Sequence, residues 1–308
     1  MKNTTPETAA TPALPRKALY LGIFSYAMWG FFPIYWKLFH GIGTGEILLH
    51  RIVWTMPFYL LLLALGPGLA LLRTSSRKDW AASALAAALL SLNWGLYIYA
   101  VLAGHVVEGS LAYFLNPLLN VAVGVVVFRE SFPWALRVAV MLAAVGVCFR
   151  IAFASTFPWI ALTLATSFCA YGVVKKKQTI HPTLSSAIEG LCGFIPAVGI
   201  LIAVRYSAAE ALSATQWGLC LGAGIVTGLP LFLFSYAAQK IPYSLLGIIQ
   251  FLAPTLQFLV GVMLYHEKLD RADAVSFGLI WAGAACYIVD RLSRWHAERR
   301  RRRKAAVR

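Results

Sequence analysis

The stretch FLNPLLNVAVGVVVFRE at residues 114–130 decides the fold, because the chain contains a second version of it. Residues 251–267 read FLAPTLQFLVGVMLYHE, and proline, glycine and glutamate recur there 137 positions later. The matching pairs are Pro117 with Pro254, Gly124 with Gly261, and Glu130 with Glu267. Self-similarity at a fixed spacing is the mark of an internal repeat, so we expect two related halves.

The composition places most of this chain in a lipid bilayer. Of its 308 residues, 60% are hydrophobic and only 13% are charged, whereas an ordinary soluble domain has about 25% charged residues. A soluble fold of this size could not hide that much apolar surface from water. The five cysteines stand singly within apolar runs, without a CxxC pair, which favours packing over a metal site or a disulfide framework.

The apolar runs predict an all-α polytopic membrane protein with ten transmembrane helices. Each run is about 20 residues long, which is enough to cross about 30 Å of hydrocarbon as a helix. The expected spans are residues 18–39, 46–65, 80–103, 107–128, 134–153, 157–174, 183–204, 217–238, 243–265 and 273–291.

Lysines and arginines predict the orientation of these helices. With the N-terminus placed in the cytoplasm, 21 of the 27 basic residues fall on the cytoplasmic side, Lys175 among them. The other six, including Arg51, fall outside or at outer helix ends. Because positive charge favours the cytoplasmic side of membrane proteins, we expect both termini in the cytoplasm.

The repeat divides the ten helices into two inverted five-helix halves. A shift of 137 residues places the fourth span on the ninth, and SYAMWG (25–30) matches SFCAYG (167–172) at a shift of 142. Five is an odd number, so the second half enters the membrane the opposite way up, as in many secondary transporters. The expected units are a segment at 1–17, repeats at 18–153 and 156–292, and a basic tail at 293–308.

Polar residues beside the two prolines predict where a solute could bind. Pro117 and Pro254 have no backbone N–H, so the carbonyls of Tyr113 and Gln250 lose their helical partners and the helices are expected to kink. Neighbouring helices, water or a solute could satisfy them. The cavity candidates are Trp29, Asn93, Tyr97, Tyr113, Asn116, Asn120, Gln250 and Gln257. The alternative is that the amides only bond helices together.

Three ionisable residues are candidates for coupling or gating. Glu46 and His50 are one turn apart at the start of the second span, where the alternative is interfacial anchoring. Glu189 lies deeper, with no basic residue close in sequence, so we expect an isolated carboxylate that could carry a proton. Glu130 and Glu267 lie at helix junctions and are expected to cap or anchor.

The basic tail carries much of the net charge of +15, because nine of the 27 basic residues lie in the last 18 positions. It directly follows an apolar span, which favours anionic lipid over nucleic acid as its partner. The sequence shows no HExxH, GxSxG or paired-aspartate motif, so we expect no enzyme, no metal and no cofactor.

Four long segments resemble the EamA type of the drug/metabolite transporter superfamily and, within it, the RarD permeases. They are GIFSYAMWGFFPIYWK (22–37), GEILLHRIVW (45–54), LNWGLYIYAV (92–101) and GHVVEGSLAYFLNPLLNVAVGVVVFRE (104–130). The resemblance implies an inner-membrane permease that exports small molecules through a cavity lined by both halves. The second EamA pattern usually ends in Gly-Glu, whereas here His266 precedes Glu267.

A secondary transporter with alternating access is the favoured function. The chain has no GxxxxGK[ST] phosphate loop, so ATP is not the expected direct energy source. A channel should line its pore with rings of charge or carbonyls, which the sequence does not show. The alternatives are therefore a channel or scaffold without coupled transport and, less favoured, a membrane-embedded enzyme. The expected partner is a small-molecule substrate, which the sequence does not identify.

Overall fold

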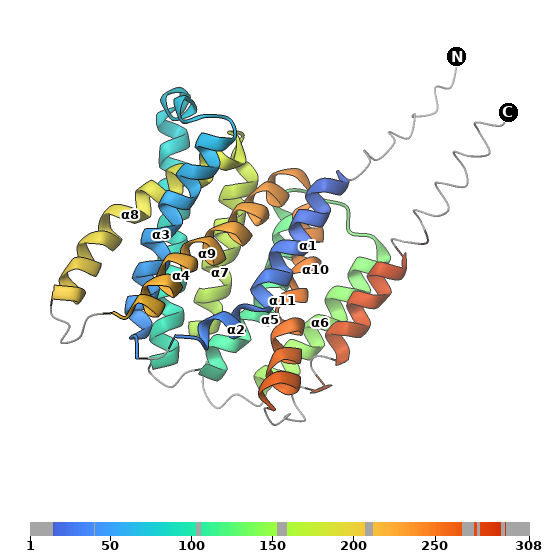
Figure 1. Cartoon of the computed structure of the whole chain (residues 1–308). Coiled ribbons are helices and arrows are strands. Elements are labelled where there is room, and N and C mark those ends of the chain that lie inside the picture. Colours follow the sequence, from blue (N-terminus) through green and yellow to red (C-terminus); the bar gives the residue numbers. More distant parts are fainter. Residues whose placement is uncertain are drawn as a thin grey trace, which may run out of the picture.

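The computed structural model describes residues 15–39, 41–102, 106–152, 159–206, 212–266, 274–275, 278–290 and 293. Within those residues the chain is a bundle of helices with no strand (Figure 1). The expected N-terminal segment and basic tail fall almost entirely outside the described residues.

The helices alternate with short connections along the whole described chain. They are α1 (Arg16–Gly30), α2 (Phe32–Trp36), α3 (Thr44–Leu65), the 3-10 helix η1 (Leu69–Thr74), α4 (Arg77–Leu102), α5 (Val106–Val126), α6 (Trp134–Ala152), α7 (Trp159–Lys177), α8 (Pro182–Tyr206), α9 (Ala214–Lys240), α10 (Tyr243–Gln250), α11 (Leu252–Leu259), the π-helix η2 (Val260–Leu264) and a last helix at Gly278–Asp290.

Five helical segments of the described chain are long and apolar enough to cross a membrane. They are Arg16–Trp36, Gly45–Leu65, Pro182–Ala203, Ala214–Lys240 and Tyr243–Leu264. Three shorter apolar helices are Leu115–Val126, Trp134–Phe149 and Gly278–Asp290. The protein is therefore an all-helical, multi-pass membrane protein, and the number of ten spans stays a prediction.

Two expected spans are interrupted. The first divides at Phe31, because Pro33 at the start of α2 has no N–H to donate to the carbonyl of Trp29. The side chain of Gln257 donates to that carbonyl as well, with Nε2 3.0 Å from it. The ninth divides at Phe251, three residues before Pro254, and ends in the π-helix η2. By contrast, α5 runs through Pro117 as one helix.

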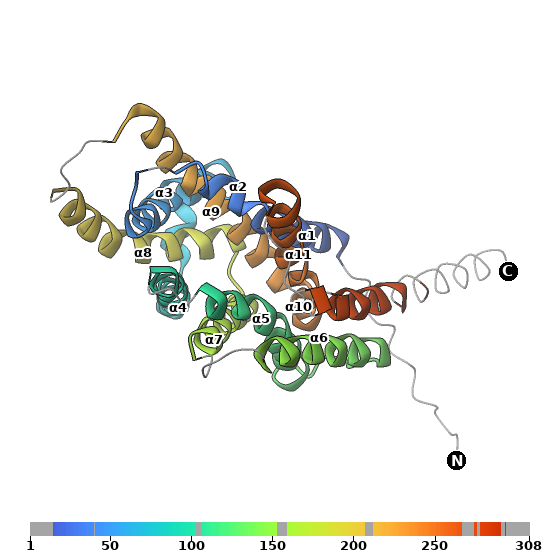
Figure 2. The ribbon, with the colours of Figure 1, turned by 90° about the horizontal axis from the view of Figure 1, so that it is seen from below.

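Helices from the first half of the chain pack mainly on helices from the second half. Helix α3 lies against α8 and α9, α4 against α7 and α8, α5 against α7 and α10, and α1 against α9 and α11 (Figure 2). Close approach depends on small residues: Gly224 of α9 lies directly against the backbone of Trp54 on α3, where a Cβ atom would collide. The two halves are thus interleaved rather than separate.

The fourth and ninth expected spans, which contain the two repeated segments, meet each other in antiparallel fashion. Asn116 of α5 bonds to Gln250 of α10 at 2.5 Å. Further along α5, the Asn120 side chain approaches Gly247, and Gly124 approaches Ser244. Residue numbers rise along α5 while those of their partners fall along α10, so the helices run in opposite directions.

Glu130 caps α10 from the other segment, as the sequence predicts for this residue. Its Oε1 accepts from the Tyr243 N–H at 2.6 Å, and its Oε2 accepts from the Ser244 N–H at 2.8 Å. Lys176 Nζ lies 3.5 Å from the same carboxylate, and burial lowers the pKa of that lysine while Glu130 partly restores it. Glu267 lies outside the described residues.

Candidate functional site

A cluster of three amides lies where α5 meets α10. Asn120 Nδ2 donates to Gln250 Oε1 at 2.5 Å and to Asn116 Oδ1 at 3.1 Å, while Gln250 Nε2 donates to Asn116 Oδ1 at 2.5 Å. Asn116 also donates to the carbonyl of Ala165 on α7 at 2.7 Å, and Tyr26 Oη donates to Gln250 at 3.4 Å. The structure therefore brings three predicted cavity residues together as a joint between helices.

The amide cluster is buried, and its members mostly satisfy one another. Asn116 is 3% exposed, Asn120 0% and Gln250 6%. Among the residues the structure describes, the Oδ1 of Asn120 has no hydrogen-bond partner. In this conformation the amides act as interhelical bonds, with one acceptor left unused.

Two further predicted cavity residues also bond to neighbouring backbone. Asn93 of α4 donates to the carbonyl of Leu164 at 2.7 Å and to Ser167 Oγ at 3.0 Å, both on α7. Gln257 donates to the carbonyl of Trp29, as described above. These amides join elements of the two halves in the same way as the cluster does.

Trp29 lies in an aromatic group rather than beside an open cavity. Its indole is 5.2 Å from the ring of Tyr26, 5.8 Å from that of Phe168 and 5.9 Å from that of Phe234. The predicted pair Tyr97 and Tyr113 forms a separate edge-to-face contact at 6.1 Å. The structure thus separates the predicted aromatic residues into two places.

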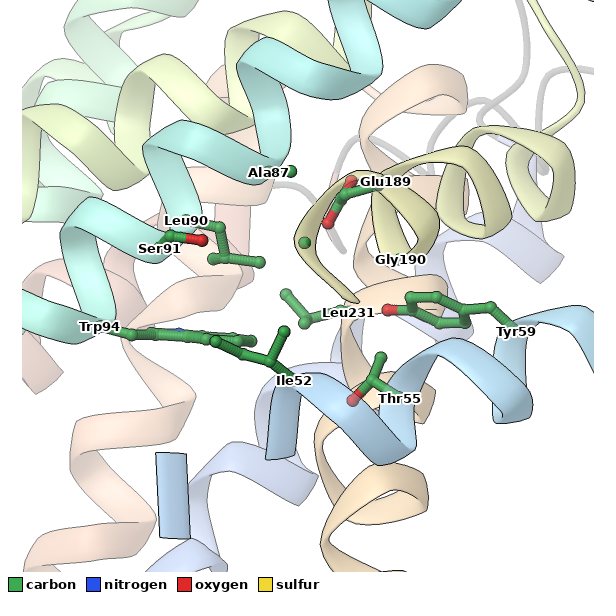
Figure 3. Close-up of a pocket in the computed structure, with 11 residues that line it drawn as sticks. Ile52, Thr55, Tyr59, Ala87, Leu90, Ser91, Trp94, Glu189, Gly190 and Leu231 are labelled. Atoms are coloured by element: carbon green, nitrogen blue, oxygen red, sulfur yellow. The ribbon is translucent and has the colours of Figure 1, made fainter. Parts of the chain in front are cut away.

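A small cavity lies between α3, α4, α8 and α9 (Figure 3). Its lining residues are Ile52, Thr55, Tyr59, Ala87, Leu90, Ser91, Trp94, Glu189, Gly190, Gly193 and Leu231. The volume is about 30 Å³, whereas pockets that enclose drug-sized ligands have roughly 300–1,000 Å³. In this conformation the cavity is of a size for water rather than for an organic solute.

Glu189 is not the isolated carboxylate that the sequence predicts, and that expectation is wrong. Lys175 Nζ lies 2.7 Å from Glu189 Oε2 and 2.7 Å from Ser185 Oγ. Tyr171 Oη donates to the other carboxylate oxygen at 3.4 Å. Lys175 is 0% exposed. It is therefore buried within the protein, whereas the prediction of orientation counts it among the basic residues on the cytoplasmic side.

Glu189, which is paired with Lys175, borders the cavity together with an unpartnered hydroxyl of the described residues. Tyr59 is 2% exposed, and its Oη has no hydrogen-bond partner in the described part of the chain. Figure 3 shows Tyr59 of α3 and Glu189 of α8 on the same cavity. A carboxylate paired with a buried ammonium and a phenol thus face the same small cavity.

Glu46 and His50 form the pair that their spacing predicts. His50 Nε2 lies 3.7 Å from Glu46 Oε1, and Trp54 Nε1 donates to His50 Nδ1 at 3.2 Å. The His50 ring also contacts the indole of Trp217 on α9 at 5.6 Å. Neither residue lines the cavity, so a gating role for this pair would act at the N-terminal end of α3.

Sequence reasoning missed Lys175, Tyr59 and Arg51 as site residues. Arg51 was counted at a helix end, but its guanidinium carbon lies 4.6 Å from the ring centres of Trp36 and Trp94. Its position two turns inside an apolar helix was the available signal, because a charge at that depth is unusual. Lys175 is the first of three consecutive lysines, and nothing in that run distinguishes it.

The described residues contain no group of three or more His, Cys, Asp or Glu side chains placed to hold a metal ion. The absence of a metal or cofactor from the function stays a prediction.

Comparison with known proteins identifies the family. The model of the EamA-like transporter family matches residues 16–151 and again residues 157–289. The chain belongs to the EamA-like transporter family. It is 39% identical to Protein RarD of Streptomyces exfoliatus, over 94% of each chain. It is also 36% identical to the uncharacterized transporter YojE of Bacillus subtilis (strain 168), over 84% of this chain and 89% of that one.

Further comparisons agree with the EamA assignment. Protein RarD of Escherichia coli (strain K12) is 35% identical, over 89% of this chain and 95% of its own. A solved crystal structure of another protein covers 88% of this chain and 97% of its own, with a TM-score of 0.69 at 19% identity. That likeness concerns the fold alone. The resemblance to RarD-type EamA permeases is confirmed, and the protein is a membrane transporter.

Proposed function

We propose that this protein is a secondary transporter that exports small metabolites or drugs across the inner membrane by alternating access. The observation that carries the proposal is the antiparallel contact between α5 and α10, which belong to the fourth and ninth expected spans, the two spans related by the repeat. Two inverted copies that meet at a seam can rock about a site between them, which is the mechanism of many transporters built from inverted repeats.

Several features support an inverted repeat of two five-helix halves, at residues 18–153 and 156–292. The family model matches two adjacent segments of similar length. Arg129 and His266, 137 positions apart, share a backbone φ of 52° just before the repeated glutamates. In Figure 1, the start of α1 and the end of the last helix lie at the same end of the bundle. That placement favours an even number of spans, and the excess of Lys and Arg on that side favours the cytoplasm for both termini.

The transport cycle then has to enlarge the space between the halves. The cavity of about 30 Å³ cannot hold an organic solute, so a solute could enter it only after the helices around it move apart. Opening would separate α5 from α10 and expose Asn116, Asn120 and Gln250 to the solute. The pair of Lys175 and Glu189 beside the cavity is our candidate for coupling that motion to a proton.

Flux measurements in vesicles test this function. Inside-out membrane vesicles with and without the protein are supplied with a metabolite extract, and the accumulated compounds are identified by mass spectrometry. The expected result is saturable, protein-dependent uptake of at least one small molecule. Absence of any protein-dependent uptake would remove the transporter proposal, and unsaturable ionic current would favour a channel.

The coupling role has its own test. Substituting Glu189→Gln should leave the protein in the membrane but flatten the pH dependence of flux, because the amide cannot exchange a proton. Glu130→Gln is the matched control, since Glu130 is a carboxylate outside the cavity. A pH profile unchanged by Glu189→Gln would eliminate the coupling role.

A further inference from the structure

Arg51 is a charged residue well inside the helical bundle. It lies seven residues after the start of α3, which places it about 10 Å along the helix axis. The side chain is partly buried, and the aromatic rings around it come from α2 and α4. A guanidinium at such a depth costs free energy unless it is paired or used.

The contacts of Arg51 leave most of its hydrogen-bonding capacity unused. A guanidinium carries five N–H donors, and among the described residues only the Nε–H has a hydrogen-bond acceptor, Thr227 Oγ1 of α9 at 3.1 Å. Cation–π contact with Trp36 and Trp94 holds the group through the faces of the indoles and consumes no donor. Among the residues the structure describes, no carboxylate forms an ion pair with it.

The surroundings of Arg51 define a place for a ligand. Trp94 contacts the guanidinium and also lines the cavity, and the neighbouring residue Ile52 lines it as well (Figure 3). The guanidinium therefore shares Trp94 with the cavity, and it lies between two indoles of the first half and Thr227 of α9 in the second half.

We propose that Arg51 binds the carboxylate or phosphate group of a small organic anion, and that the transported solutes are such anions. Two parallel N–H···O bonds from the unused Nη groups suit a planar carboxylate or a phosphate. The indoles hold the guanidinium in place and offer contact area to an aromatic or apolar body. The proposal rests on the transport function, because it names the class of solute that the proposed transporter carries.

The alternative is that Arg51 only fastens α2, α4 and α9 to α3. Stacking on Trp36 and Trp94 with one bond to Thr227 would satisfy that role. The two interpretations differ in a measurable way, because a fastener gives no preference for an anionic ligand over a neutral one of the same shape.

The experiment is a binding titration of the purified full-length protein in detergent. The probes are benzoate, phenyl phosphate and benzamide, which share one ring and differ in charge, and the readout is the shift in unfolding temperature. We expect benzoate or phenyl phosphate to stabilise the wild-type protein and benzamide to leave it unchanged. Arg51→Gln should abolish the shift, and Arg51→Lys should weaken binding about tenfold through loss of the bidentate geometry. Lys176→Gln is the control for a basic residue elsewhere.

Three outcomes would overturn the proposal. They are equal stabilisation by benzoate and benzamide, an anion response in Arg51→Gln equal to that of the wild type, and no response to either anion. If Arg51→Gln does not fold, Arg51→Lys decides, since undiminished affinity there would also overturn the proposal. Saturable flux of a neutral solute that is unaffected by Arg51→Gln would remove the anion site and keep the transporter. Anion binding without flux of any compound would keep the anion site and remove the transport function.

Discussion

The amide cluster of Asn116, Asn120 and Gln250 and the charged pair of Lys175 and Glu189 are both buried at contacts between helices, but they differ in chemistry. The amides are neutral and bond mainly to one another. In the charged pair, Glu189 borders a cavity that is also lined by Tyr59, whose hydroxyl has no hydrogen-bond partner among the described residues.

The amide cluster is therefore suited to holding the two halves together, whereas the charged pair could act on a solute or a proton. A neutral amide can exchange one partner for another at a net cost of about 1 kcal/mol, so the cluster can open and close. A buried charge cannot lose its partner so cheaply. We therefore assign a joint to the cluster and a coupling element to the pair, and four predictions test the distinction.

The largest effect is expected from Lys175→Met. The substitution leaves Glu189 buried without its cation, which should lower the free energy of unfolding by about 3–5 kcal/mol. Thermal unfolding in detergent measures the loss. The double variant Lys175→Met with Glu189→Leu should recover most of it, because neither charge remains; a single variant as stable as the wild type would show that the pair is unimportant.

The amide cluster should show a smaller and strongly coupled effect. Asn120→Leu and Gln250→Leu are each expected to lower stability by about 1–3 kcal/mol, because each leaves a buried partner unsatisfied. Since the two side chains bond to each other, the double variant should lose less than the sum of the single losses. Additive losses would mean that the cluster is not a single joint.

The sequence predicted some of these features and not others, for physical reasons. The repeat, the apolar helices and the cap by Glu130 follow from spacing and local chemistry, which the sequence carries directly. The partner of Glu189 could not be predicted, because Lys175 lies 14 residues away across the turn from α7 to α8. The bond from Gln257 to the carbonyl of Trp29 joins residues 228 positions apart, and only the packed bundle determines it.

Glu130 should contribute less than either buried group, because it acts at the start of one helix. Glu130→Gln removes a charged acceptor from the N–H groups of Tyr243 and Ser244, which should cost about 1 kcal/mol. Unfolding temperature measures the loss. If Glu130→Gln lowered the free energy of unfolding as much as Lys175→Met does, the charge that matters most for stability would be Glu130 at the start of α10 rather than the pair of Lys175 and Glu189.

Asp79 provides the smallest effect and serves as a reference for polar groups outside the joint and the cavity. Its carboxylate accepts from the Ser76 N–H at 2.8 Å and from the Ser76 hydroxyl at 2.7 Å, and these bonds lower its pKa. A lowered carboxyl pKa adds stability above the usual value of about 3.9, and that stability disappears as the pH falls through the lowered pKa.

Because Asp79 is exposed, Asp79→Asn should change the free energy of unfolding at pH 7 by no more than about 0.5 kcal/mol. The difference from the wild type should shrink further below pH 4. Comparison of unfolding at pH 7 and at low pH measures it. A difference that grows as the pH falls would contradict the assigned sign.

The central claim is that two copies of one unit lie in the membrane in opposite orientations, and cysteine labelling tests it most directly. Arg129 and His266 occupy equivalent, exposed positions of the two copies. Each is replaced by cysteine in a background in which the five native cysteines are changed to alanine. An impermeant maleimide is then applied to intact cells and to inside-out vesicles. The account predicts that Arg129→Cys reacts only from the cytoplasmic side and His266→Cys only from the outer side. Reaction of both from the same side would contradict it.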